Sequence, residues 1–180
     1  MGRYLDELKR ASSFLSSKSD VIFVGQNTVY PGSVMSRTFI DEVPREKRIE
    51  FPVFENTQMG MSIGLALAGY VPVSVFGRPN FLLYAMGMLV NELDKISTIT
   101  NGKCFPKVII KVMNGSVRPI DPGVQHRGDF TDVFRIALQN IEVIRLDWPF
   151  QIFEAYRHAY ERNDGKSTIL VELGDYYEEK

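Results

Sequence analysis

Residues 48–76 read RIEFPVFENTQMGMSIGLALAGYVPVSVF, and this stretch decides the fold class. Two mostly apolar segments of strand length, at residues 49–54 and 71–76, flank a segment at residues 55–68 that has helical character. Gly69 follows this segment, as glycine commonly follows the last turn of a helix. A strand, a helix and a second strand in this order predict a parallel sheet.

The same alternation continues on both sides of this unit. Further helices are predicted at residues 3–17, 32–43, 80–99 and 131–138, and further strands at residues 21–24, 108–113, 142–146 and 168–173. Asp147 is the predicted N-cap of one more helix, with Pro149 in its first turn. The pattern predicts a single α/β domain over residues 1–180, with an N-terminal helix within residues 1–18. We expect three layers: a mostly parallel sheet of about six strands, with helices on both faces.

The composition excludes several classes of partner. The 180 residues carry a formal net charge of −1, so no basic excess indicates nucleic acid. No apolar run approaches the roughly 20 residues of a membrane span. The single cysteine, Cys104, excludes an internal disulfide and has no His or Cys cluster near it, so we assign no metal to this chain. A chain with a single cysteine fits a reducing compartment, so we expect a cytoplasmic protein.

Ligands of open parallel sheets bind at the carboxyl ends of the strands. Three predicted junctions lie there: Phe54-Glu55, residues 76–81, and the long loop at residues 114–130, which contains His126. Loops of this length in compact domains are often functional. We therefore expect the chemistry at these three places.

The residues at these junctions resemble a known family. Glu55 follows a strand and precedes a glycine-spaced helix with the pattern E-x4-G-x3-G-x4-G-x2-P, which ends at Pro72. Asn80-Phe81 opens the next helix, and His126 lies in the glycine-rich loop at residues 122–128. These motifs, over about residues 21–173, resemble the pyrimidine-binding domain of transketolases and of 2-oxoacid dehydrogenase beta chains, which are thiamine-diphosphate-dependent enzymes.

Some residues depart from the family pattern. The family usually has Asp-Gln where this chain has Gly87-Met88, and His126-Arg127-Gly128 replaces the His-Ser-Gln of the dehydrogenases. The diphosphate-binding signature, Gly-Asp-Gly followed by Asn, is absent. We therefore expect neither a diphosphate-binding domain nor a third C-terminal domain in this chain.

The resemblance implies a role for each matching residue. Glu55 would share a proton with a pyrimidine nitrogen of thiamine diphosphate, which makes the cofactor's own amino group basic enough to activate its thiazolium carbon. Phe81 would pack on the pyrimidine ring. His126 would be a catalytic residue that faces the substrate, and Arg127 beside it would bind a substrate phosphate or carboxylate.

The resemblance also implies an assembly. The partner would be a diphosphate-binding, alpha-like subunit that holds Mg²⁺, and the chain would form a homodimer or a heterotetramer through the helix that carries Gly60 and Gly64. The complex would catalyse 2-oxoacid decarboxylation or ketol transfer on a small molecule, and the isolated chain would be inactive.

Two alternatives stay open. The chain could be a non-catalytic structural or regulatory subunit that retains the transketolase-like fold, which the change at Gly87-Met88 favours and the presence of Glu55 opposes. It could instead be an unrelated nucleotide-binding α/β domain. The absence of a glycine-rich phosphate loop after the first strand opposes that second alternative.

Overall fold

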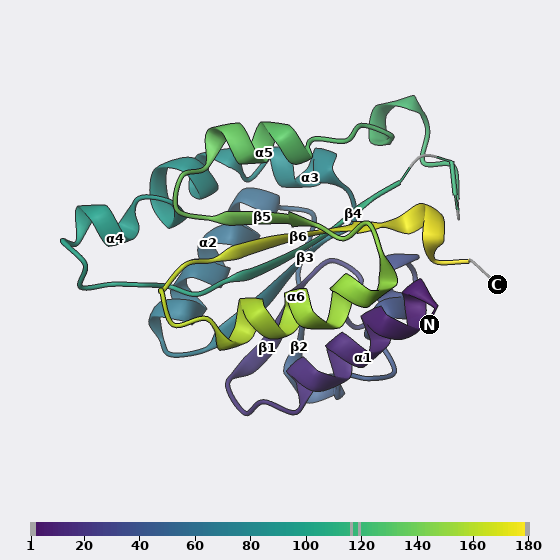
Figure 1. Cartoon of the computed structure of the whole chain (residues 1–180), viewed down its shortest axis with the longest axis horizontal. Helices are drawn as coiled ribbons and strands as arrows, with labels where there is room; N and C mark the ends of the chain where they lie inside the picture. Colours follow the sequence, from purple (N-terminus) through teal and green to yellow (C-terminus); the bar gives the residue numbers. More distant parts are fainter. Residues whose placement is uncertain (1–2, 116, 119, 179–180) are drawn as a thin grey trace.

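The computed structural model describes residues 3–115, 117–118 and 120–178. Its centre is a six-stranded sheet in the order β2-β1-β3-β4-β6-β5, in which every neighbouring pair is parallel (Figure 1). The strands are β1 (Val21–Gly25), β2 (Arg48–Glu50), β3 (Val71–Phe76), β4 (Ile109–Asn114), β5 (Glu142–Arg145) and β6 (Thr168–Leu173). The predicted fold class is confirmed.

Helices cover both faces of the sheet. On one face α1 (Tyr4–Ser16) and α6 (Pro149–Glu161) pack side by side and form one apolar core with the strands (Figure 1). On the other face α2 (Glu55–Leu67), α3 (Pro79–Leu83) and α5 (Thr131–Ala137) form a second core. Within the described ranges, no helix is long and apolar enough to cross a membrane.

The helix predicted at residues 32–43 is wrong. This segment contains only the short 3-10 helix η1 (Met35–Thr38) between turns. The Ser36 hydroxyl donates to the Ser33 carbonyl at 2.6 Å, and the Thr38 hydroxyl donates to the Met35 carbonyl at 2.8 Å. Short hydroxyl side chains that bond to the nearby backbone compete with regular helix formation.

The single helix predicted at residues 80–99 is also wrong. It is divided into α3, the π-helix η3 (Met88–Leu93) and α4 (Ile96–Ile99). The break before α4 coincides with Asp94, whose buried carboxylate accepts the backbone N–H groups of Gln139 and Asn140 at 2.9 and 2.6 Å. Asp94 thereby links this segment to the turn after α5, and the helix is interrupted between Leu93 and Ile96.

Two predicted boundaries also need correction. Strand β2 ends at Glu50 rather than at residue 54, and Pro52, which lacks a backbone N–H, follows soon after. The N-cap of α6 is Trp148 rather than Asp147, and the backbone N–H of Trp148 donates to the Gln151 side chain at 3.0 Å. Pro149 occupies the first turn as predicted.

Three short 3-10 helices were not indicated by the sequence. They are η2 (Arg45–Lys47), η4 (Val124–His126) and η5 (Gly174–Tyr176). The first leads into β2, the second lies in the loop after β4, and the third directly follows β6.

Candidate functional site

The direction of strand addition reverses at β1 and β3. From β1 the chain adds β2 on one side, and α2 then carries it back to β3 on the other side of β1. The carboxyl ends of such a pair form a crevice where ligands of open α/β sheets bind. Gly25 ends β1, and a Cβ at Gly25 would lie only 2.5 Å from the Val75 carbonyl oxygen. Glycine therefore permits the close approach of β1 and β3 beside this crevice.

Glu55 is the first residue of α2 and lies beside the crevice. Its side chain is almost wholly buried, with 8% of the residue exposed. Oε1 accepts a hydrogen bond from Nε2 of Gln26 at 3.1 Å. The positive end of the helix dipole favours a carboxylate at this position. Glu55 therefore has its carboxyl group fixed by Gln26 at the start of the helix, the position that the sequence predicted.

The turn that carries Gln26 is ordered by a second glutamate. Glu50, the last residue of β2, accepts the backbone N–H groups of Asn27 at 2.7 Å and Val29 at 2.8 Å. Asn27 has a positive φ of 56°, which asparagine tolerates better than most residues. Because Glu50 holds this turn, Gln26 is fixed at the end of β1, within reach of Glu55.

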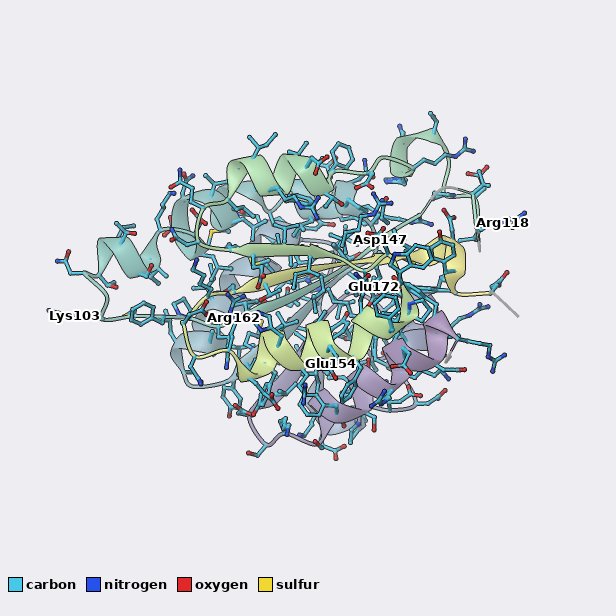
Figure 2. The ribbon with its side chains drawn as sticks, viewed as in Figure 1. Lys103, Arg118, Asp147, Glu154, Arg162 and Glu172 are labelled. Carbon is cyan, nitrogen blue, oxygen red and sulfur yellow. The ribbon has the colours of Figure 1, made fainter. Side chains whose placement is uncertain are left out.

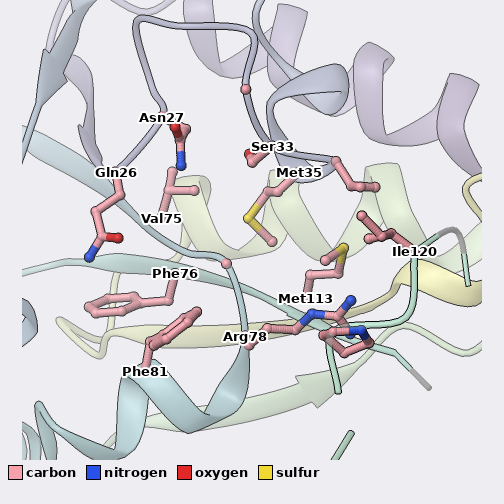
Figure 3. A pocket seen from close by; sticks show the side chains of 14 residues that line it. Gln26, Asn27, Ser33, Met35, Val75, Phe76, Arg78, Phe81, Met113 and Ile120 are labelled. Carbon is pink, nitrogen blue, oxygen red and sulfur yellow. The ribbon is translucent and has the colours of Figure 1, made fainter. Parts of the chain in front are cut away.

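A cavity of about 240 Å³ opens at the carboxyl ends of β1, β3 and β4 (Figure 3). Gln26, Phe76 and Phe81 lie together on one side of it (Figure 3). The remaining lining residues are Asn27, Gly32, Ser33, Val34, Met35, Val75, Gly77, Arg78, Met113, Ile120 and Pro122. Glu55 is not among the lining residues, but Gln26 joins it to the cavity wall.

His126 lies behind Phe81. The two rings have their centroids 5.0 Å apart at an interplanar angle of 38°. His126 does not line the cavity, and its Nδ1 is buried without a hydrogen-bond partner among the described residues. The structure thus brings together these two predicted residues, of which only Phe81 lines the cavity.

Arg127 makes a local ion pair. Its Nε donates to the Asp121 carboxylate at 3.1 Å, and both side chains are exposed. This hydrogen bond raises the pKa of Arg127 and lowers the pKa of Asp121. Arg127 and Asp121 thus form an ion pair within one loop. Arg127 does not line the cavity.

Sequence reasoning missed Gln26 and Arg78. Gln26 directly follows the Gly25 that ends β1, and Arg78 follows the Gly77 after β3. Both positions are next to strand ends at the switch point, so the strand order would have singled them out. That order could not be read from the chain because it depends on which strands pair.

Comparisons with known proteins show which proteins the chain is similar to. No protein-family model matches the chain. It is 24% identical over 148 residues to the beta subunit of 3-methyl-2-oxobutanoate dehydrogenase from Mycobacterium tuberculosis, covering 81% of this chain and 41% of that protein. It is 26% identical over 119 residues to the mitochondrial pyruvate dehydrogenase E1 beta subunit of Saccharomyces cerevisiae, covering 65% and 32%.

Two solved structures share the fold. A split-gene transketolase, described as an inactive beta4 tetramer, matches with a TM-score of 0.69 and 16% identity, covering 96% of this chain and 51% of that chain. Transketolase from Campylobacter jejuni matches with a TM-score of 0.72 and 15% identity, covering 94% and 25%.

In sequence the chain resembles 2-oxoacid dehydrogenase beta chains, and in fold it resembles transketolases. Both of these groups of proteins depend on thiamine diphosphate. The chain spans about two fifths of the mycobacterial beta subunit that it matches.

Proposed function

We propose that this chain is the pyrimidine-binding, beta-like subunit of a split thiamine-diphosphate enzyme that decarboxylates 2-oxoacids or transfers ketol groups. One observation carries the proposal: the buried Glu55 carboxyl accepts a hydrogen bond from Gln26, and Gln26 lines the same cavity as Phe81. These are a carboxylate, a neutral hydrogen-bonding group and an aromatic face, the three features that a pyrimidine ring needs from a protein.

The residues fit the pyrimidine half of the cofactor. Gln26 occupies Oε1 of Glu55, which leaves Oε2 to hold a proton shared with a ring nitrogen. Phe81 offers one ring face to the cavity side, and its contact with His126 restrains the ring. When bound, the cofactor supplies the reactive thiazolium carbon; the task of Glu55 is to keep the pyrimidine in the state that activates it.

The proposed partner is a diphosphate-binding, alpha-like subunit that also holds Mg²⁺. Apolar side chains next to Glu55 are strongly exposed: Val53 at 73% and Phe54 at 62%. On α2, a Cβ at Gly64 would meet no atom within 4 Å, so that glycine faces open space. We propose that this surface is covered in the assembly, by the partner or by a second copy in a homodimer or heterotetramer.

We expect the isolated chain to bind thiamine diphosphate very weakly. Its contacts to the cofactor would be one carboxyl group and one aromatic face, each contributing about 1 kcal/mol. A dissociation constant of 1 mM already requires roughly 4 kcal/mol. Calorimetry with Mg²⁺ and cofactor, on the chain alone and then with its partner, is the measurement. Micromolar binding by the chain alone would contradict the division of the site between two subunits.

We expect His126→Ala to lower turnover by roughly 10²-fold or more, the range of a lost general acid or base, while cofactor affinity changes much less. His126 contacts the ring of Phe81 but does not line the cavity, and its Nδ1 has no hydrogen-bond partner among the described residues, so we assign it to the substrate rather than to the pyrimidine. Steady-state kinetics and cofactor titration of the reconstituted complex separate the two effects. His158→Ala is the matched control, because His158 is exposed on α6. Lost cofactor binding with normal turnover at saturation would place His126 wrongly.

A further inference from the structure

The cavity has a second end, away from Phe81. Arg78, Met113 and Ile120 lie together there, on the side opposite Gln26 and Phe76 (Figure 3). We call these three residues the Arg78 end. The proposed role of Glu55 and Phe81 uses none of them.

Arg78 is a cation held almost out of water. The residue is 5% exposed, and Nη1 donates to the Gly115 carbonyl at 2.7 Å. A Cβ at Gly115 would lie 2.8 Å from Nη1, so glycine permits this approach. Burial lowers the pKa of Arg78, while the Asp175 carboxylate raises it. An arginine remains charged under these conditions, and its guanidinium carries five N–H groups in a fork that suits carboxylates.

The other walls near Arg78 are apolar. Met35 and Met113 are almost completely buried, at 1% and 4% exposure, and Ile120 stands at the surface with 58% exposed. The cavity volume of about 240 Å³ lies below the 300–1,000 Å³ typical of pockets for drug-sized ligands, so the ligand must be small. A sugar phosphate at this end would place several hydroxyl groups against the apolar side chains of Met35, Met113 and Ile120, which is less favourable than placing an aliphatic chain there.

We propose that the Arg78 end binds the carboxylate group of a small aliphatic acid, with the acid's short apolar chain packed against Met35 and Met113. Such an acid can be a 2-oxoacid substrate or a saturated acid that acts as product or effector. The inference goes beyond the proposed function, because binding at this end requires neither the cofactor nor a partner subunit and is measurable on the full chain alone.

The test uses the methionine methyl groups as probes. The chain contains seven methionines, and with ¹³C-methyl labelling the NMR signals of Met35 and Met113 report on the cavity. We expect 3-methyl-2-oxobutanoate to shift both signals saturably with millimolar affinity, whereas Met59, buried in α2, stays unchanged. Titration with 3-methylbutanoate separates the two sources of acid. Tighter binding of the 2-oxoacid indicates a substrate subsite, and equal binding indicates a site for acids in general.

Charge variants decide whether Arg78 carries the binding. Arg78→Met should weaken binding of the acid by roughly tenfold or more, and Arg78→Lys should retain part of the affinity. Asp175→Asn should tighten binding, because it removes a negative charge near Arg78 that repels the carboxylate of the acid. Ile120→Glu, at an exposed position, should repel the acid even if Arg78→Met fails to fold. No saturable shift in the native chain, or equal affinity in Ile120→Glu, would overturn the proposal. Acid binding that persists while thiamine diphosphate fails to bind the reconstituted complex would instead refute only the proposed function.

Discussion

Replacing Glu55 by glutamine is expected to abolish turnover of the reconstituted complex and to slow exchange of the thiazolium proton by several orders of magnitude. An amide has a similar shape and can still accept the hydrogen bond from Gln26, but it cannot share a proton with a ring nitrogen. Removal of such a proton-transfer group typically costs 10²–10⁴-fold, roughly 3–5 kcal/mol of transition-state stabilisation. Hydrogen–deuterium exchange at the thiazolium carbon, followed by NMR, measures the effect directly.

Glu46→Gln is the matched control for this variant. Glu46 lies on η2, two residues before β2, and is exposed. It undergoes the same chemical change away from the cavity, so exchange and turnover should stay close to native. Unfolding curves of both variants separate a chemical defect from a structural one. Near-native exchange in the Glu55→Gln complex would remove Glu55 from the proposed role.

The sequence predicted the elements whose signals are local. Strands β3 and β6 have the predicted bounds, because both are buried over their whole length. The start of α2 at Glu55 also agrees, since the glycine-spaced helix follows it directly. Phe81 and His126 were singled out separately, and the structure shows that their rings are in contact.

The rest depended on contacts between distant parts of the chain. The apolar spacing at residues 80–99 suits one helix, but Asp94 bonds to the backbone more than forty residues away and interrupts it. Gln26 acquires its role only when β1 pairs with β3 and α2 starts beside them. The sequence around Arg78 shows only an arginine before a helix. Its burial depends on the contact with the Gly115 carbonyl, in a loop 37 residues further along the chain.

A buried ionic network in the core was also missed, although the sequence holds a signal for it. Lys111 and Glu172 are the charged residues within the otherwise uncharged strands β4 and β6. Lys111 lies opposite Leu170 in the register, so Glu172 is its diagonal neighbour on the same face. The two form an ion pair with 1% and 0% of their side chains exposed. Opposite charges in two apolar strands suggest such a pair, but only once the strands are known to be adjacent.

Two tyrosines complete the network around Glu172, which is labelled in Figure 2. The hydroxyl groups of Tyr156, on α6, and Tyr177, after β6, each donate to the Glu172 carboxylate. Lys111 Nζ also donates to the Tyr156 hydroxyl at 3.2 Å. Burial lowers the pKa of Lys111 and, together with the charge of Glu172, raises the pKa values of both tyrosines. Glu172 is therefore the acceptor that joins the sheet, α6 and the C-terminal segment.

Glu172→Gln is expected to destabilise the chain by about 3–5 kcal/mol, because it leaves the Lys111 charge buried without a counter-charge. That is a large share of a typical domain stability of about 5–15 kcal/mol. The double variant Lys111→Met, Glu172→Gln removes both charges; its amide oxygen can accept from one tyrosine hydroxyl, and its NH2 group can donate to the other. It should therefore be more stable than Glu172→Gln alone. Urea unfolding of the native chain, both single variants and the double variant forms a complete double-mutant cycle. If the double variant loses the sum of the two single effects, the charges are not coupled, and the hydrogen bonds of the tyrosines hold this part of the core together.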